Sequence, residues 1–315
     1  MKFMNTQEII NFTAENYMND NGSPELNYQD YLKIYRSWEV YSPSLDKIRN
    51  RLPLKDSVVK LVYKKIYSKM PFDREYILKK YEHTYKYIDY LLYPSINAER
   101  LVVLLSGYSQ RKTYNRYSWF WDDTEKWDGS TAYLFLNDTE NTWYCGHENQ
   151  KINVYKEVIF LISNRYKLDN RKIYIVGGSM GGYAALRLGL ELNLGGVISI
   201  NPQTSLEAAS LHKDPSWFQS INKCGENFIP VAEIIRRNEP TKIYLECGDY
   251  LADSFDLESI SQAIVEKGGL FILNHHSSDK HVTSSPNKEQ LDMLISFFSD
   301  DTISNLAAEN NVLSS

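Results

Sequence analysis

The sequence predicts an α/β protein with a mostly parallel central sheet and helices on both faces. From about residue 83 onward, short β-branched and aromatic runs alternate with longer amphipathic ones, the order expected of strand–helix–strand units. The short runs are continuously apolar, as strands buried on both faces are. Residues 1–82 instead space apolar groups three and four apart among charges, which predicts an N-terminal helical extension packed on the core.

The individual elements follow from these runs. Connections between parallel strands should be right-handed. We divide the chain into an N-terminal helical region (1–82), a sheet domain (83–300) and a C-terminal tail (301–315). The expected strands are 84–93, 100–108, 130–138, 172–178, 195–202, 241–249 and 270–275, and the expected helices are 151–166, 180–192, 259–267 and 288–298.

The composition argues against several classes of function. The 315 residues carry a net charge of −5 without a basic patch, so we expect no nucleic-acid binding. We also expect no membrane span, since no run reaches the roughly 18 apolar residues needed, and no signal peptide. Three cysteines without a CxxC pair fit a reducing, cytoplasmic location. No metal-binding motif is present, so we expect no catalytic metal.

One glycine-rich turn carries the predicted chemistry. The run 177–182 (GGSMGG) contains G-x-S-x-G and lies between an expected strand and an expected helix. This context is typical of the nucleophile elbow of the α/β-hydrolase fold, where flanking glycines relieve the clashes around a strained serine. The turn lacks the glycine patterns of nucleotide-binding loops. We therefore expect Ser179 to be a nucleophile, with tight packing of a plain turn as the alternative.

A serine nucleophile needs a base, and the base needs an acid that orients it. In this fold they follow in the order serine, acid, histidine along the chain. The histidine should come after the strand at 270–275, and we predict His281, in the loop before the last helix. His275 and His276, at the end of that strand, are the alternatives. Each of the three histidines could instead be structural or exposed.

The acid should lie in the loop after the strand at 241–249. Asp253 is the first choice, because it lies far enough into the loop to reach round to a histidine. Asp249, directly at the strand end, is the second choice. Capping of a helix N-terminus would explain Asp256 without any role in catalysis.

Two backbone N–H groups are expected to form the oxyanion hole. The N–H of Met180 is one, because the N-terminal N–H groups and the dipole of the helix that begins there face the reaction centre. The second should come from the loop after the strand at 100–108. There we choose the N–H of Tyr108, with Gly107 permitting close approach.

The same loop is a candidate substrate-binding segment. Arg111, Lys112 and Arg116, together with Asn115, could bind an anionic substrate or a phosphate-bearing donor. A solvated basic loop is an equally good interpretation of these charges.

Two further stretches follow strand ends that border the expected cleft. Trp143 and Tyr144 could stack on a sugar ring, although a small core within their own loop explains them as well. The run 201–203 (NPQ), after the strand that follows the elbow, could also reach the substrate.

Four blocks of the sequence resemble a bacterial branch of the α/β-hydrolase superfamily. They are GYSQRKTYNRYSWF, YLFLNDTENTWYCG, IYIVGGSMGGYAALRLG and ISINPQ. The branch includes capsule-biosynthesis proteins and glycan O-acetyltransferases, among them the accessory-secretion type that acetylates sugars on adhesins. The resemblance covers about residues 83–300. The family's nucleophile matches Ser179, its histidine matches His281, and its acid falls in the Asp249/Asp253 loop.

The resemblance implies acyl transfer in two steps through an acetyl-enzyme on Ser179. The implied acyl donor is acetyl-CoA, with no bound cofactor, and the implied acceptor is a hydroxyl of a bacterial surface or capsular polysaccharide. Capsule-synthesis machinery is an implied partner. Three alternatives stay open: an esterase or deacetylase with the same triad, a peptidase of this fold, and a non-catalytic hydrolase-like component of polysaccharide biosynthesis or export.

Overall fold

The computed structural model describes most of the predicted sheet domain and only the end of the N-terminal region. Within residues 1–82 it describes helix α4 (Arg74–Tyr81) and Glu82. The rest of that region and the predicted tail 301–315 lie outside the described residues. The chain divides into two compact units, and the second, made of His83–Leu91, Leu101–Asn115 and the chain from Tyr133 onward, contains most of the sheet. The described residues are 74–93, 95, 98–109, 111–117, 130–146, 150–281 and 286–300.

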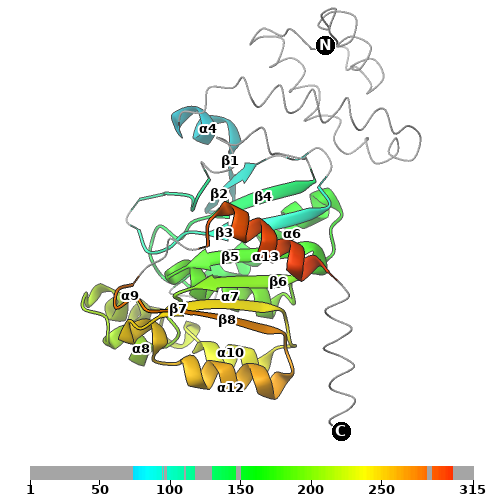
Figure 1. Ribbon diagram of the computed structural model, residues 1–315. Coiled ribbons are helices and arrows are strands. Elements are labelled where there is room, and N and C mark those ends of the chain that lie inside the picture. The colour runs from blue at the N-terminus through cyan, green and yellow to red at the C-terminus, as the bar shows by residue number, and fades with distance from the viewer. Residues whose placement is uncertain are drawn as a thin grey trace, which may run out of the picture. The chain divides into compact units, whose positions relative to one another are not determined.

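Within the described residues the strands form one sheet with the order β1-β2-β4-β3-β5-β6-β7-β8 (Figure 1). From β3 to β8, by way of β5, β6 and β7, every neighbouring pair runs in parallel. The predicted α/β class with a mostly parallel sheet is therefore confirmed. The strands are β1 (Glu82–Tyr85), β2 (Ile88–Tyr93), β3 (Arg100–Leu105), β4 (Thr131–Leu136), β5 (Ile173–Gly178), β6 (Gly196–Ile200), β7 (Ile243–Gly248) and β8 (Phe271–His276).

The central strands are buried along their whole length. Every residue of β4, β5, β6 and β7 is buried, whereas β8, at the end of the sheet, is half-buried or exposed throughout. A strand covered on both faces has no solvent side, so it gains from apolar residues at every position. This explains why the sequence shows continuous apolar runs rather than alternation.

One predicted strand proves to be two. The run at 84–93 was expected to be continuous, but a turn at Lys86 and Tyr87 separates β1 from β2. Lys86 has φ of 54°, in the left-handed region that a strand residue does not occupy. A connection of two residues makes a hairpin, so these strands run in opposite directions. The alternation of aromatic and polar residues along 84–93 fits one continuous strand as well as the two strands of a hairpin.

The predicted helices are confirmed at α6 (Gln150–Tyr166), α7 (Met180–Glu191), α12 (Leu257–Lys267) and α13 (Lys288–Ser299). The segment between β6 and β7 received no predicted element, yet three short α-helices and one 3₁₀ helix (Gly225–Asn227) lie there. A fourth short α-helix follows β7. None of these four α-helices has the length over which apolar periodicity becomes clear. They are α8 (Leu206–Ser210), α9 (Ser216–Cys224), α10 (Val231–Arg237) and α11 (Leu251–Ser254).

Helices α7 and α13 cover opposite faces of the sheet. A side chain at Gly189 of α7 would collide with Val197 on β6, and one at Gly196 would collide with Phe298 of α13. Successive strand residues point to opposite faces, so the contacts at 196 and 197 lie on opposite sides. Figure 1 agrees, since α13 lies in front of the strands and α7 lies behind them. None of the described helices has the length and apolar character that crossing a membrane would require.

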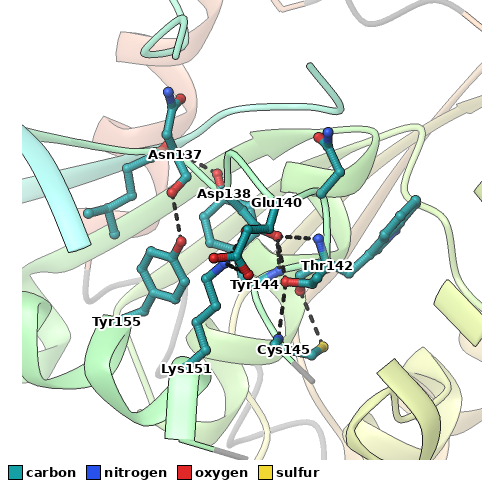
Figure 2. Close-up of polar contacts among 12 residues, drawn as sticks. Asn137, Asp138, Glu140, Thr142, Tyr144, Cys145, Lys151 and Tyr155 are labelled. Carbon is teal, nitrogen blue, oxygen red and sulfur yellow. Dashed lines mark hydrogen bonds and ion pairs between the residues drawn. The ribbon is translucent and has the colours of Figure 1, made fainter. Parts of the chain in front are cut away.

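The loop after β4 folds around the buried carboxylate of Asp138 (Figure 2). Lys151, on α6, approaches Asp138 Oδ1 to 2.6 Å and also lies 3.0 Å from Glu140. Asp138 Oδ2 accepts bonds from the backbone N–H groups of Thr142, at 2.6 Å, and Tyr144, at 3.0 Å. Burial lowers the pKa of Lys151, but the two carboxylates outweigh it and the pKa is raised. Lys151 therefore stays charged and pairs with Asp138.

This network also fixes the ends of two strands. The hydroxyl of Tyr144 lies 3.0 Å from the carbonyl oxygens of both Ser106 and Leu136, which share its single proton. Ser106 follows β3 and Leu136 ends β4. Burial raises the pKa of Tyr144 well above its ordinary value, so the hydroxyl keeps the proton that it donates. Asp138 positions Tyr144, and Tyr144 in turn holds Ser106, directly before the loop at Gly107.

The Asp138→Asn variant tests the structural weight of this carboxylate. We expect the free energy of unfolding to fall by about 3 kcal/mol, since the buried ammonium of Lys151 loses its main counter-charge. Urea denaturation followed by circular dichroism measures the change. The exposed Asp279 supplies the matched control, and Asp279→Asn should leave the urea midpoint unchanged. Equal midpoints for the two variants would show that the network contributes little to stability.

Candidate active site

Ser179 follows β5 and precedes α7 in a strained backbone conformation. Its φ is 58° and its ψ is −125°, which a residue with a side chain adopts only when its surroundings enforce it. The Ser179 N–H donates to Ile200 O at 2.8 Å, and its carbonyl accepts bonds from the N–H groups of Gly182 and Tyr183. The sharp strand-to-helix turn predicted from GGSMGG is therefore present, with the serine at its tip.

Glycines allow the parts of this turn to approach one another. A Cβ at Gly181 would lie 2.6 Å from Leu105 O and 2.8 Å from Ser106 O, so the first turn of α7 packs directly on the end of β3. A Cβ at Gly107 would lie 3.6 Å from the Cβ of Ser179. The loop after β3 therefore lies against the serine at Gly107.

This position is where the order of the sheet reverses. The chain leaves β3 toward β4 on one side and continues from β5 through β6 to β8 on the other. Ligands of open α/β sheets bind at such a point, outside the carboxyl ends of the strands. Residues that follow β5, β7 and β8 lie along this same edge of the sheet, because these strands run in parallel.

His281 and Asp253 are paired. Nδ1 of His281 lies 2.7 Å from one carboxylate oxygen of Asp253 and 2.9 Å from the other. The Asp253 side chain is fully buried, and the imidazole is 16% exposed. A carboxylate only accepts hydrogen bonds, so Nδ1 carries the proton and Nε2 of the neutral ring has a free lone pair. Nε2 is buried and has no hydrogen-bond partner among the described residues.

The other candidates for acid and base lie elsewhere. Asp249 is 54% exposed and lies 3.2 Å from Nε2 of His275, a pair at the surface. Nε2 of His276 is 4.0 Å from Glu246. Asp256 occupies the N-cap position of α12, but its side chain makes no capping bond. It accepts a hydrogen bond from Thr204 instead, so the capping explanation for its side chain was wrong.

The hydroxyl of Ser179 is directed at a residue outside the predicted triad. Ser179 Oγ donates to Oε1 of Gln203 at 3.2 Å, and Gln203 is 1% exposed. The hydrogen bond from Ser179 to His281 that a catalytic triad uses is not made in this structure. Gln203 belongs to the NPQ run after β6 that was expected to reach the substrate.

Both predicted oxyanion donors lie next to the elbow. Met180 is the first residue of α7, so no carbonyl of its own helix can accept its N–H. For the N–H of Tyr108, the described part of the chain offers no acceptor. The next residue is anchored, because the Ser109 N–H donates to Asn141 Oδ1 at 2.9 Å.

The residues predicted to bind substrate occupy different surroundings. Arg111 is exposed, whereas Lys112 forms an ion pair with Asp89 at 2.7 Å. The Asn115 side chain donates to Leu105 O at 3.0 Å, which holds the end of β3. Arg116 has φ of 59° and belongs to the first of the two compact units.

Trp143 is a fully buried member of the loop after β4. Its φ is 52°, and its ring centroid lies 6.0 Å from that of Tyr108. The indole Nε1 is also buried and makes no hydrogen bond with any described residue. The ring therefore has no exposed face in this structure.

Sequence reasoning missed an aromatic wall around His281. Trp217, on α9, meets the imidazole of His281 with ring centroids 4.6 Å apart and planes at 77°. His212 stacks on Trp217 at 3.4 Å, and its Nδ1 lies 2.9 Å from the hydroxyl of Tyr250. Burial and then the neighbouring His281 lower the pKa of His212. His212 lies between α8 and α9, and Trp217 lies on α9, so both belong to a segment in which the sequence pattern predicted no helix.

Within the described part of the chain, no group of three or more His, Cys, Asp or Glu side chains could hold a metal ion. No family model and no curated protein matches the sequence.

Solved structures do resemble it. A capsule O-acetyltransferase of Neisseria meningitidis serogroup A is 19% identical over 68% of this chain and 94% of its own, with a TM-score of 0.54. FphF, a fluorophosphonate-binding serine hydrolase of Staphylococcus aureus, is 13% identical over 70% of this chain and 97% of its own, with a TM-score of 0.52. A chain of the Gap123 glycosylation-associated complex of Streptococcus agalactiae is 16% identical over 69% of this chain and 45% of its own, with a TM-score of 0.51. These likenesses and the sheet topology show that the chain has the α/β-hydrolase fold.

Proposed function

We propose that this chain is a serine acyltransferase that moves an acetyl group through an acetyl-enzyme on Ser179. The observation that carries the proposal is the pair of His281 and buried Asp253, with Nε2 of His281 unbonded among the described residues. This pair lies along the edge of the sheet at which Ser179, in its strained conformation, precedes α7. We assign the chemistry to residues 83–300.

In the first step, the hydroxyl of Ser179 turns from Gln203 toward His281. Nε2 of His281 takes the proton while Oγ bonds to the acyl carbon, and Asp253 stabilises the imidazolium that forms. The N–H groups of Met180 and Tyr108 are the proposed donors to the oxyanion. When the intermediate collapses, the bond to the leaving group breaks and His281 returns the proton to it. With acetyl-CoA, the leaving group is the thiol of coenzyme A.

In the second step, a hydroxyl of the acceptor attacks the acetyl-enzyme. Its proton passes to Nε2 of His281, a new ester bond forms, and Ser179 recovers the proton as its own ester bond breaks. When the acceptor is a sugar hydroxyl, the product is an O-acetylated glycan. When the acceptor is water, acetate is released and the protein acts as an esterase. The same residues serve both outcomes, so exclusion of water decides between them.

The choice of transfer rests on two supports. The similar Neisseria protein is a capsule O-acetyltransferase, and the sequence blocks described above resemble the same branch. Arg111, exposed in the loop after β3, is the proposed contact for phosphates of the donor. A bacterial surface or capsular polysaccharide is the proposed acceptor, with capsule-synthesis machinery as partner and the cytoplasm as location.

Labelling of Ser179 tests the covalent intermediate. Incubation with acetyl-CoA or a fluorophosphonate probe should place one acetyl or phosphonyl group on Ser179, because this hydroxyl is the proposed nucleophile at the N-terminus of α7. Intact-protein and peptide mass spectrometry locate the adduct. Ser179→Ala should remove the adduct and lower the turnover of p-nitrophenyl acetate by about a thousandfold or more. A folded wild-type protein that stays unlabelled by both reagents would point to a non-catalytic component.

Paired substitutions test the assignment of the acid. Asp253→Asn should lower kcat/KM for p-nitrophenyl acetate by about a thousandfold or more, because the amide no longer holds Nδ1–H or stabilises the imidazolium. Asp249→Asn is the matched control, and it should keep a kcat/KM close to the wild-type value. The reverse ranking of the two variants would transfer the role to Asp249.

A further inference from the structure

Gln203 touches the nucleophile from a buried and well-anchored position. Its Nε2 donates to Asn201 O at 3.3 Å, and its Oε1 accepts the hydroxyl proton of Ser179 at 3.2 Å. The backbone carbonyl can only accept a hydrogen bond, so the amide nitrogen must face Asn201. The amide oxygen therefore faces Ser179, and the serine must be the donor of this bond.

Bonds that do not involve Ser179 hold this segment. The Oγ1 hydroxyl of Thr204, the next residue, donates to Asp256 at 2.6 Å, and the backbone carbonyl of Thr204 accepts the N–H of Val231 at 2.9 Å. Asp256 closely follows α11, the helix that carries Asp253. The bonds of Thr204 and the bond from Gln203 Nε2 to Asn201 O therefore hold this segment independently of the serine proton.

Among the described residues, the hydroxyl of Ser179 is the only hydrogen-bond donor to the amide oxygen of Gln203, and acylation removes that donor. The serine proton passes through His281 to the leaving group, and Oγ becomes an ester oxygen that cannot donate. An unpaired amide oxygen in a buried site is unfavourable, so a new donor is favoured there. The vacancy exists only in the acyl-enzyme, which is the form that the acceptor meets.

We propose that Gln203 Oε1 binds a second hydroxyl of the acyl acceptor, and so selects acceptors with two neighbouring hydroxyl groups. This inference rests on the proposed function. An alcohol hydroxyl has one proton, and the attacking hydroxyl gives that proton to Nε2 of His281. The adjacent hydroxyl of a vicinal diol, as found on sugar rings, donates to Gln203. A monohydric alcohol leaves Gln203 unpaired, whereas the two protons of one water molecule can serve both groups.

A competition between two alcohols tests the proposal. The acetyl-enzyme is generated from p-nitrophenyl acetate in an equimolar mixture of cyclohexanol and the vicinal cis-cyclohexanediol. The acetate esters are quantified by gas chromatography, and the ratio of the two products measures the preference. Gln203→Met removes the acceptor oxygen while keeping the length of the side chain. Gln262→Met, on α12, is the matched control, because Gln262 is bonded only to Glu266 among the described residues.

Wild type and Gln262→Met should favour the diol, and Gln203→Met should lower this preference about 3- to 10-fold while still releasing p-nitrophenol in a burst. A merely structural role would lower both products together and leave their ratio unchanged. A Gln203→Met ratio equal to that of wild type overturns the inference while the acyl-enzyme stands. If Gln203→Met fails to fold, Gln203→Leu replaces it with the same readout. A wild type that shows no burst, or a Ser179→Ala variant that keeps it, overturns the proposed function itself.

Discussion

The site depends on one constraint, the left-handed backbone of Ser179. A residue with a side chain holds φ of 58° only if packing on every side enforces it. Here the N–H of Ser179 is bonded to Ile200 O, at the end of β6, and the first turn of α7 lies against the carbonyls that end β3. The sheet thus fixes the serine from both neighbouring strands. The same contacts bring the loop at Gly107 against it, where a backbone donor to an oxyanion is needed.

The buried charge of Asp138 supports this arrangement from a distance. It binds Lys151 and the backbone of the loop after β4 (Figure 2). The hydroxyl of Tyr144 then joins the ends of β3 and β4. Tyr144 has φ of 61°, which this loop sustains because several groups converge on one carboxylate. Strain at the elbow and strain in this loop are both held by buried hydrogen bonds. These bonds keep Ser179 in a fixed position, from which its hydroxyl proton can be transferred.

The surroundings of His281 distinguish two carboxylates that sequence could not separate. Asp253 lies in a short helix that turns its side chain into the protein, so its charge is used by one partner, the imidazole. Asp249 is nearer to the strand but faces solvent, where its pair with His275 is weakened by screening. Trp217 limits the orientations of the imidazole on another side. Burial, rather than distance along the chain, thus separates the two acidic residues.

The sequence alone determined the class of sheet, most of its strands and helices, and the elbow at Ser179, because continuous apolar runs and a glycine-flanked serine are local patterns. Within the loops, the sequence ranked His281 and Asp253 first but did not exclude the neighbouring histidines and aspartates. The division of 84–93 into a hairpin, the short helices after β6, the aromatic wall and the contact of Gln203 with Ser179 were decided by tertiary structure. The aromatic wall and the contact of Gln203 with Ser179 join segments remote in sequence, such as residues 217 and 281 or 179 and 203, and no local periodicity encodes such a contact. The hairpin and the short helices are too short for a clear periodic pattern.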